Sequence, residues 1–319
     1  MGSRAYFYNK NQTMKTPFYR VALRFLLLLS LTATGLVTTS CKKDAPELKD
    51  YSGIDDEIIK KYLADNNITD AVKQPNGIYF RSISKSTTGA KITPGSYASV
   101  LYTGRLLDAA ATVFDASSKR NNVPINFIVG SNQLIQGFES GIALMSYGDK
   151  AEIYIPSALA YGPSSSGAIP ANDVIRFEVE VIDYKVVDDA LITKYLTDKS
   201  ITTAQKQPSG LYFLPITTEP NGARPVAGST VSVLYTGRLF DAAGTIFDAS
   251  SRQNNVPFQF KIGSNQVIKG FEEGILLMRK GEKAEIIIPS ALAYGPTGAG
   301  NVIAPNSVIR FEVELVDIK

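Results

Sequence analysis

The same aspartate occurs in the same phrase twice in this sequence. "TVFDASS" contains Asp115 and "TIFDASS" contains Asp248, 133 residues later. Each aspartate follows a phenylalanine, and each phrase is followed by "IPSALAYG", which contains Tyr161 or Tyr294. An aspartate in this setting could cap a hairpin or bind a tyrosine hydroxyl. It could equally be the ionisable group of an aromatic binding pocket.

Missing residue types exclude several kinds of catalysis. The chain has no histidine, no tryptophan and only one cysteine, Cys41. Ser-His-Asp and Cys-His catalysis need a histidine base, and Cys/His zinc sites need several such ligands. A single cysteine also forms no disulfide within the chain.

Length and composition indicate a folded protein of two domains. The chain has 319 residues, of which 44% are hydrophobic and 20% are charged. Its formal charge of +3 comes from residues 1–40, which contain five basic groups and no acidic group. Beyond them, 28 basic residues face 30 acidic ones, so no nucleic-acid partner is indicated.

The repeat extends well beyond the aspartate phrase. "KYLADNNITDAVKQPNGIYF" from Lys61 matches "KYLTDKSITTAQKQPSGLYF" from Lys194 at the same offset of 133. A solenoid repeat is ~20–50 residues long, so this period predicts a duplicated domain. We expect a first domain at 55–186 and a second at 187–319.

Hydrophobic spacing predicts the same elements in each copy. A helix with Asp55 as its N-cap has an apolar face at helical spacing. Apolar and polar residues alternate in "KAEIYIP" from Lys150 and "IRFEVEVI" from Ile175, which predicts half-buried strands. A short helix from Gln136, ahead of these two strands, places Phe138, Ile142 and Met145 on one side. The fold class is therefore α+β: an antiparallel sheet curled over one short helix, twice, each copy preceded by an N-terminal helix.

The joint pattern "VLYTGRL…FDAS…GSNQ.I.GFE.GI…KAEI.IPSALAYG" resembles the FKBP family of peptidyl-prolyl cis-trans isomerases. The resemblance covers roughly Ser96–Lys185 and Ser229–Lys319. It implies an antiparallel half β-barrel around a short helix, and isomerase (rotamase) activity with no cofactor, no metal and no covalent intermediate. It also implies proline-containing polypeptide clients and macrolide-type ligands.

The family's pocket carries over residue by residue. The resemblance implies a catalytic group in each copy: Tyr102, Asp115 and Tyr161, then Tyr235, Asp248 and Tyr294. It implies these substrate-binding residues in the first copy: Phe114, Ile125, Leu134, Ile135, Phe138, Ile169 and Phe177. It implies these in the second: Phe247, Phe258, Val267, Ile268, Phe271, Ile303 and Phe311.

Three features depart from the family pattern. The pocket floor, commonly a tryptophan, is Phe138 or Phe271 here. The first copy has Ile125 where the second has Phe258. The loop after Tyr161 is one residue shorter than its counterpart in the second copy.

The chemistry implied is rotation about an amide bond. Its barrier of ~18–20 kcal/mol comes from resonance. An apolar pocket disfavours the charge-separated resonance form. The C–N bond therefore has less double-bond character, and the barrier to rotation is lower. The family assigns substrate orientation to a tyrosine hydroxyl and an isoleucine N–H, here Tyr161 with Ile135 and Tyr294 with Ile268. The alternative is a non-catalytic peptide-binding module or holdase chaperone that uses the same pockets.

The first forty residues are typical of a secretory signal peptide, with Met14 as the true start. A basic stretch precedes an apolar run from Phe25 to about Val37, shorter than the ~20 residues that span a bilayer. Thr39 and Ser40 precede Cys41 as in a bacterial lipoprotein signal. We therefore expect a signal peptide at 1–40, a lipidated Cys41 and a polar tether at 41–54. This predicts a membrane-anchored protein of the cell envelope, at the outer membrane.

Overall fold

The computed structural model describes residues 50–319. The predicted signal peptide, the lipidation site at Cys41 and most of the tether lie outside the described residues. Within the described part, no helix has the length and apolar content needed to cross a bilayer.

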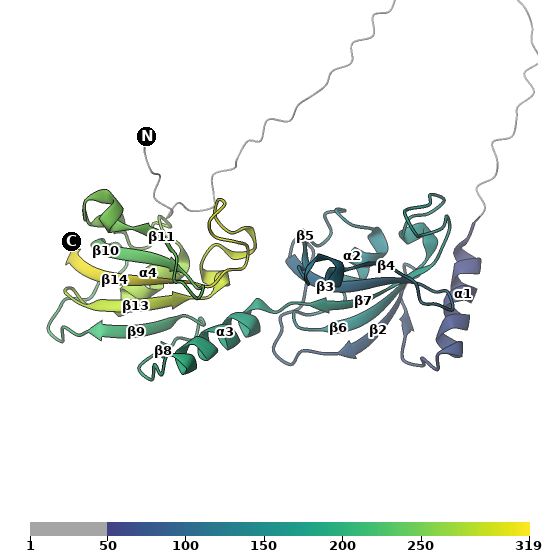
Figure 1. Ribbon diagram of the computed structural model, residues 1–319, viewed down its shortest axis with the longest axis horizontal. Helices are drawn as coiled ribbons and strands as arrows, with labels where there is room; N and C mark the ends of the chain where they lie inside the picture. The colour runs from purple at the N-terminus through teal and green to yellow at the C-terminus, as the bar shows by residue number, and fades with distance from the viewer. Residues whose placement is uncertain (1–49) are drawn as a thin grey trace, which may run out of the picture. The chain divides into compact units, whose positions relative to one another are not determined.

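The first copy folds as one antiparallel sheet with two helices, shown in Figure 1. Its helices are α1 (Ser52–Asp65) and α2 (Gln136–Ile142), with short 3₁₀ turns η1 (Ser117–Arg120) and η2 (Ser157–Leu159). Its strands are β1 (Val72–Lys73), β2 (Tyr79–Ser84), β3 (Tyr97–Leu106), β4 (Val113–Ala116), β5 (Ile125–Ile128), β6 (Lys150–Ile155) and β7 (Ile175–Val181).

The second copy repeats this order. Its helices are α3 (Tyr184–Asp198) and α4 (Lys269–Leu277), with 3₁₀ turns η3 (Ser250–Gln253), η4 (Ser290–Leu292) and η5 (Gly295–Thr297). Its strands are β8 (Gln205–Lys206), β9 (Tyr212–Thr217), β10 (Thr230–Leu239), β11 (Ile246–Ala249), β12 (Phe258–Lys261), β13 (Lys283–Ile288) and β14 (Ile309–Ile318).

Both sheets have the same strand order. The first runs β1-β2-β6-β7-β3-β4, and the second runs β8-β9-β13-β14-β10-β11. The long strand β3 pairs with β5 along its first half and with β4 along its second half, and β10 does the same with β12 and β11. The predicted fold class is confirmed: two antiparallel sheets with short helices, each preceded by a helix.

Helices pack against both faces of the first sheet. On one face, α2 packs so closely that a Cβ on Gly137 would lie 2.2 Å from Cγ2 of Ile155. On the other face, Ile59 and Leu63 of α1 pack against Tyr79 and Tyr154. Tyr154 is fully buried there, so the N-terminal helix buries part of a face that alternation alone assigns to solvent.

Two details of the predicted helices were wrong. Asp55 does not cap α1, because the helix begins at Ser52 and Tyr51 holds the N-cap position. Asp55 is instead buried in the first turn and bonded to Ser157. The short helix α2 ends at Ile142, although Met145 beyond it is buried as expected.

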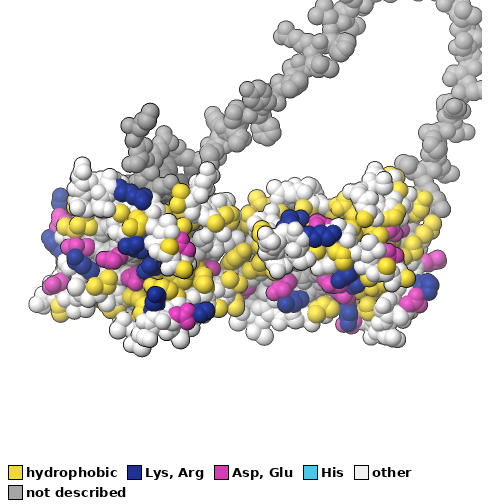
Figure 2. All heavy atoms as spheres, in the orientation of Figure 1, with side chains coloured by type: hydrophobic (Ala, Val, Ile, Leu, Met, Phe, Trp, Pro, Cys, Tyr) yellow, Lys and Arg dark blue, Asp and Glu magenta, His cyan; other side chains and the backbone are white. Residues whose placement is uncertain are grey.

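The exposed surface mixes both charge signs. On the face shown in Figure 2, basic and acidic side chains are interspersed. Several form ion pairs across neighbouring strands, including Lys150 with Glu180 and Lys283 with Glu314.

Candidate active site

A cavity of about 480 Å³ opens in the first domain where the strands curl around α2. It is lined by nine of the ten predicted residues together with Gln133: Tyr102, Phe114, Asp115, Ile125, Leu134, Ile135, Phe138, Tyr161 and Phe177. The tenth, Ile169, is buried in the same hydrophobic cluster. The structure therefore brings together residues that lie up to 75 positions apart in the chain.

Different elements supply each wall of this cavity. Tyr102 comes from β3, Phe114 and Asp115 come from β4, and Phe177 comes from β7. Gly104 lets the aromatic rings approach the backbone of β3, since a Cβ there would lie 2.5 Å from the Phe114 ring. The glycine of the "YTG" phrase is thus required by ring packing, and Gly237 has the same role in the second copy.

A buried carboxylate holds the loop before α2. Glu139, which is 6% exposed, accepts hydrogen bonds from the backbone N–H groups of Gly130 (2.8 Å) and Leu134 (2.9 Å). Leu134 and Ile135 are thereby held at the cavity wall. Sequence reasoning missed Glu139, because a glutamate in a helix gives no signal of long-range backbone contacts.

Edge-to-face aromatic contacts build the floor. The ring centroids of Phe138 and Phe177 lie 4.9 Å apart at an interplanar angle of 77°, and those of Phe114 and Phe177 lie 5.5 Å apart at 88°. Such T-shaped pairs are favoured over face-to-face stacking. The phenylalanine that replaces the family's tryptophan therefore still forms a closed aromatic floor.

The predicted tyrosine and aspartate meet at this floor. The Tyr102 hydroxyl donates to Asp115, and the Ala116 N–H donates to the same carboxylate at 2.8 Å. Burial opposes ionisation of Asp115, but the Tyr102 and Ala116 hydrogen bonds and the nearby Arg120 charge outweigh it, so the pKa of this carboxyl is lowered. Burial, and then the Asp115 carboxylate, raise the pKa of Tyr102.

The second copy places its equivalents in the same way. The Tyr235 hydroxyl donates to Asp248 at 2.9 Å, and the Ala249 N–H donates to Asp248 at 2.8 Å. Phe271 and Phe311 have ring centroids 4.9 Å apart. The remaining predicted residues belong to, or pack against, one hydrophobic cluster: Phe247, Phe258, Val267, Ile268, Tyr294 and Ile303.

Comparison with known proteins decides the family. The family of FKBP-type peptidyl-prolyl cis-trans isomerases matches this chain at residues 89–182 and 222–316. These two ranges cover more than half of the chain and contain the predicted pocket residues of both copies. The chain belongs to the FKBP family.

Individual relatives match one or both FKBP domains. Mouse peptidyl-prolyl cis-trans isomerase FKBP9 is 29% identical over 224 residues, which cover 70% of this chain but 35% of that protein. The chain thus spans about a third of that relative's length. FK506-binding protein 2 of Candida glabrata is 54% identical over 95 residues, covering 30% of this chain and 68% of that protein. FK506-binding protein 1 of Dictyostelium discoideum is 45% identical over 106 residues, covering 33% of this chain and 96% of that protein.

The 3₁₀ turn η1 adds a residue to the first FKBP pocket that sequence reasoning missed. Arg120 donates to the Tyr102 hydroxyl at 2.6 Å and forms an ion pair with Asp115 at 3.5 Å. Its guanidinium also lies 5.4 Å from the centroid of the Tyr102 ring. A comparison of the two copies could have pointed to Arg120, because Gln253 replaces it in the second FKBP domain.

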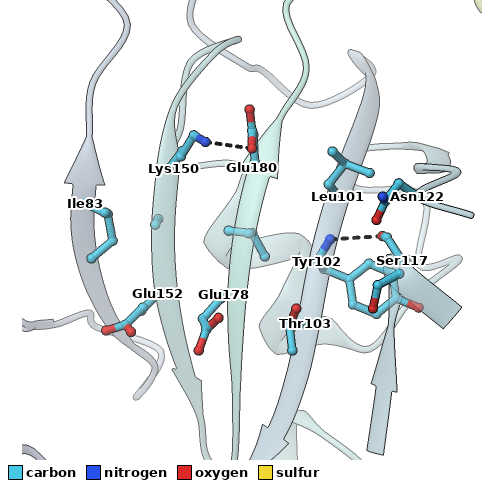
Figure 3. A pocket seen from close by; sticks show the side chains of 13 residues that line it. Ile83, Leu101, Tyr102, Thr103, Ser117, Asn122, Lys150, Glu152, Glu178 and Glu180 are labelled. Carbon is cyan, nitrogen blue, oxygen red and sulfur yellow. Dashed lines mark hydrogen bonds and ion pairs between the residues drawn. The ribbon is translucent and has the colours of Figure 1, made fainter. Parts of the chain in front are cut away.

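A second hollow of about 400 Å³ lies against the first FKBP sheet, shown in Figure 3. Its lining includes Ile83, Leu101, Glu178 and Glu180, which come from β2, β3 and β7. Figure 3 also shows the Ser117 hydroxyl accepting a hydrogen bond from the Tyr102 backbone N–H, at 3.0 Å. This bond fixes the strand that carries Tyr102 into the FKBP pocket.

Residues 50–319 contain no group of three or more acidic, cysteine or histidine side chains placed to hold a metal ion.

Proposed function

We propose that this protein catalyses cis-trans isomerisation of X-Pro bonds during the folding of exported proteins in the bacterial cell envelope. The observation that carries the catalytic part is the aromatic cavity of the first domain with its Tyr102–Asp115 pair, repeated in the second domain as Tyr235–Asp248. Uncatalysed isomerisation takes tens to hundreds of seconds, which is slow enough to limit folding.

The pocket supplies orientation and desolvation rather than a nucleophile. Its floor is aromatic, and Asp115 is held by Tyr102 and Arg120. A proline ring can enter such a cup, where an apolar surrounding disfavours the charge-separated amide resonance form. We assign substrate orientation to the hydroxyls of Tyr161 and Tyr294 with the backbone N–H groups of Ile135 and Ile268.

Burial supports the assignment of Tyr161 as a hydrogen-bond donor. Burial, followed by the nearby Asp115 charge, raises the pKa of Tyr161. Its hydroxyl therefore keeps its proton throughout the physiological pH range and can donate to a substrate carbonyl.

The envelope assignment rests on the sequence before the described residues. A basic segment, a short apolar run and Thr39-Ser40-Cys41 support export followed by lipidation. We propose that Cys41 anchors the chain to the outer membrane, with residues 41–54 as a tether for domains at 55–186 and 187–319. Proline-containing polypeptides are the proposed clients, macrolide-type compounds the proposed ligands, and nucleic acid no partner.

An isomerisation assay tests the catalytic proposal. The intact chain should accelerate cis-trans exchange of a prolyl peptide, and a macrolide of the FK506 type should inhibit it. The alternative, a non-catalytic holdase, would bind the same peptide and suppress client aggregation without changing the exchange rate. Binding without acceleration would therefore favour the holdase.

A further inference from the structure

The two pockets differ in one charged residue beside the tyrosine-aspartate pair. "SSKRNNVP" in the first domain becomes "SSRQNNVP" in the second, so Arg120 corresponds to Gln253. The preceding cations make matching backbone contacts, although the charge of Arg252 also acts on the Tyr235 hydroxyl. Lys119 donates to the Phe114 carbonyl at 3.0 Å, and Arg252 donates to the matching Phe247 carbonyl at 2.7 Å. Within this turn, the charge difference is therefore Arg120 alone.

Arg120 contacts the functional pair rather than the surrounding backbone. Its Nη2 lies 2.6 Å from the Tyr102 hydroxyl, and its Nη1 lies 3.5 Å from Oδ2 of Asp115. The side chain is 45% exposed, so it is open to solvent at the pocket rim. A guanidinium has five N–H donors, and these two contacts leave donors for a further acceptor.

In the second domain, the residues around the tyrosine-aspartate pair differ from those in the first. The hydrogen bonds described for Asp248 come from the Tyr235 hydroxyl and the Ala249 N–H, which are both neutral donors. Phe258 lies edge-to-face with Tyr235, at 6.2 Å between centroids, where the first domain has Ile125. The exposed Gln253 brings no charge to this pair.

We infer that Arg120 determines the charge preference of the first pocket, which accepts peptides with an acidic residue next to the proline. The inference rests on the proposed binding of prolyl polypeptides. Arg120 balances the Asp115 charge, so an incoming carboxylate meets a guanidinium rather than an uncompensated aspartate. The second pocket presents Asp248 without this cation and gains nothing from an acidic neighbour of proline.

The test compares two peptides that differ in one charge. They have the same sequence apart from Glu or Gln immediately before proline, and they are titrated into the intact two-domain chain. Backbone amide resonances of Ile135 and Ile268 report the two pockets separately, so each pocket yields its own ratio of Kd for Gln to Kd for Glu. A partly exposed ion pair is worth about two- to fivefold in affinity.

We expect a ratio of about two to five at the first pocket and about one or less at the second. Arg120→Gln should lower the first ratio to that of the second pocket, and Gln253→Arg should raise the second. High salt should reduce the preference, because exposed charges are screened beyond about 8 Å at physiological ionic strength.

A control variant addresses another charge difference between the two copies. Lys269 of the second domain replaces Gln136 at the start of the short helix and is exposed, and Lys269→Gln should leave the second ratio unchanged. Equal ratios in the two wild-type pockets, or a first ratio that Arg120→Gln does not alter, would overturn the inference. If neither peptide bound either pocket, the proposed function itself would be contradicted, and the inference with it.

Discussion

At the scale of single residues, the pocket is distinguished by a carboxylate whose partners are few and specific. Asp115 and Asp248 each accept one tyrosine hydroxyl and one backbone N–H, and Asp115 also forms an ion pair with Arg120. Asp248 is 6% exposed, and a buried carboxylate is costly unless hydrogen bonds compensate for the lost water. An aspartate with a purely structural role would also bind a tyrosine hydroxyl. Substitution of the polar groups distinguishes this role from a contribution to turnover.

Removing these polar groups from both pockets should slow isomerisation more than it destabilises the fold. We expect the Tyr161→Phe/Tyr294→Phe chain to lose several-fold in kcat/KM, since one hydrogen bond contributes about 0.5–1.5 kcal/mol. Asp115→Ala/Asp248→Ala should also lower kcat/KM. The measurement is prolyl-peptide exchange with thermal melting in parallel.

The melting curve separates the two roles of these residues. A fall in Tm that accounts for the lost activity would make the tyrosines and aspartates structural. Unchanged kcat/KM in both double variants would remove them from the catalytic site. Phenylalanine at the two tyrosine positions retains the aromatic rings, so the tyrosine double variant tests the hydroxyls alone.

The pH dependence of the first pocket should be flat near neutrality. The pKa of Asp115 is lowered from an ordinary value of about 3.9, and the pKa values of Tyr102 and Tyr161 are raised from about 10. Asp115 therefore stays ionised and both tyrosines stay protonated between about pH 5 and 9. The test measures kcat/KM across this range in a chain whose second pocket carries Asp248→Ala and Tyr294→Phe. A titration step near neutrality would contradict the assignment.

At the scale of elements, each N-terminal helix is fastened to the segment that leads to a pocket tyrosine. Asp188 of α3 is 2% exposed and accepts from the Ser290 N–H at 2.8 Å and from the Ser290 hydroxyl at 2.6 Å. Asp55 of α1 makes the same two bonds to Ser157. Each serine lies four positions before its tyrosine, Tyr294 or Tyr161.

Breaking this connection in the second domain should be destabilising. Asp188→Ala leaves a buried N–H and hydroxyl without their acceptor, at a cost of about 1–3 kcal/mol. Asp188→Asn retains an acceptor oxygen and should cost less. Denaturant unfolding of the intact chain measures both variants, with the exposed Asp198→Ala as the surface control. If Asp188→Ala were as stable as that control, the contact would have no stabilising role.

At the scale of the whole molecule, the duplication gives two FKBP domains on one chain, and their predicted pocket residues are not identical: Ile125 corresponds to Phe258. Each copy has its own sheet, its own core under the short helix and its own core under the N-terminal helix. The proposed anchor would hold both pockets near a membrane that exported proteins cross or enter.

The anchor is tested by a single substitution. Cys41→Ser removes the residue proposed to carry the lipid, so it should release the protein from the membrane fraction. One acyl chain gives only marginal binding, so the proposed anchor needs several chains on Cys41. Fractionation of cells that express either form measures this. A serine variant that stays with membranes after signal cleavage would place the anchor elsewhere, whereas release of both forms would show that Cys41 is not lipidated.

The sequence by itself determined the fold class and the duplication, and it predicted a pocket in each copy. Alternation in "IRFEVEV" predicts a half-buried strand, and β7 alternates in burial as predicted. In the first domain, nine of the ten residues predicted from the repeated motif line one cavity. The roles of these residues, the anchor and the domain limits stay predictions.

Only the tertiary structure decided the contacts between distant segments. Asp55 looked like a helix cap, but it meets Ser157, 102 residues away. Arg120 looked like one more basic residue in a polar turn, until the turn placed its guanidinium on Tyr102. Helix α1 buries Tyr154 on a face that alternation assigns to solvent. Periodicity reports which way a side chain points within its own element, whereas these partners depend on how the elements pack.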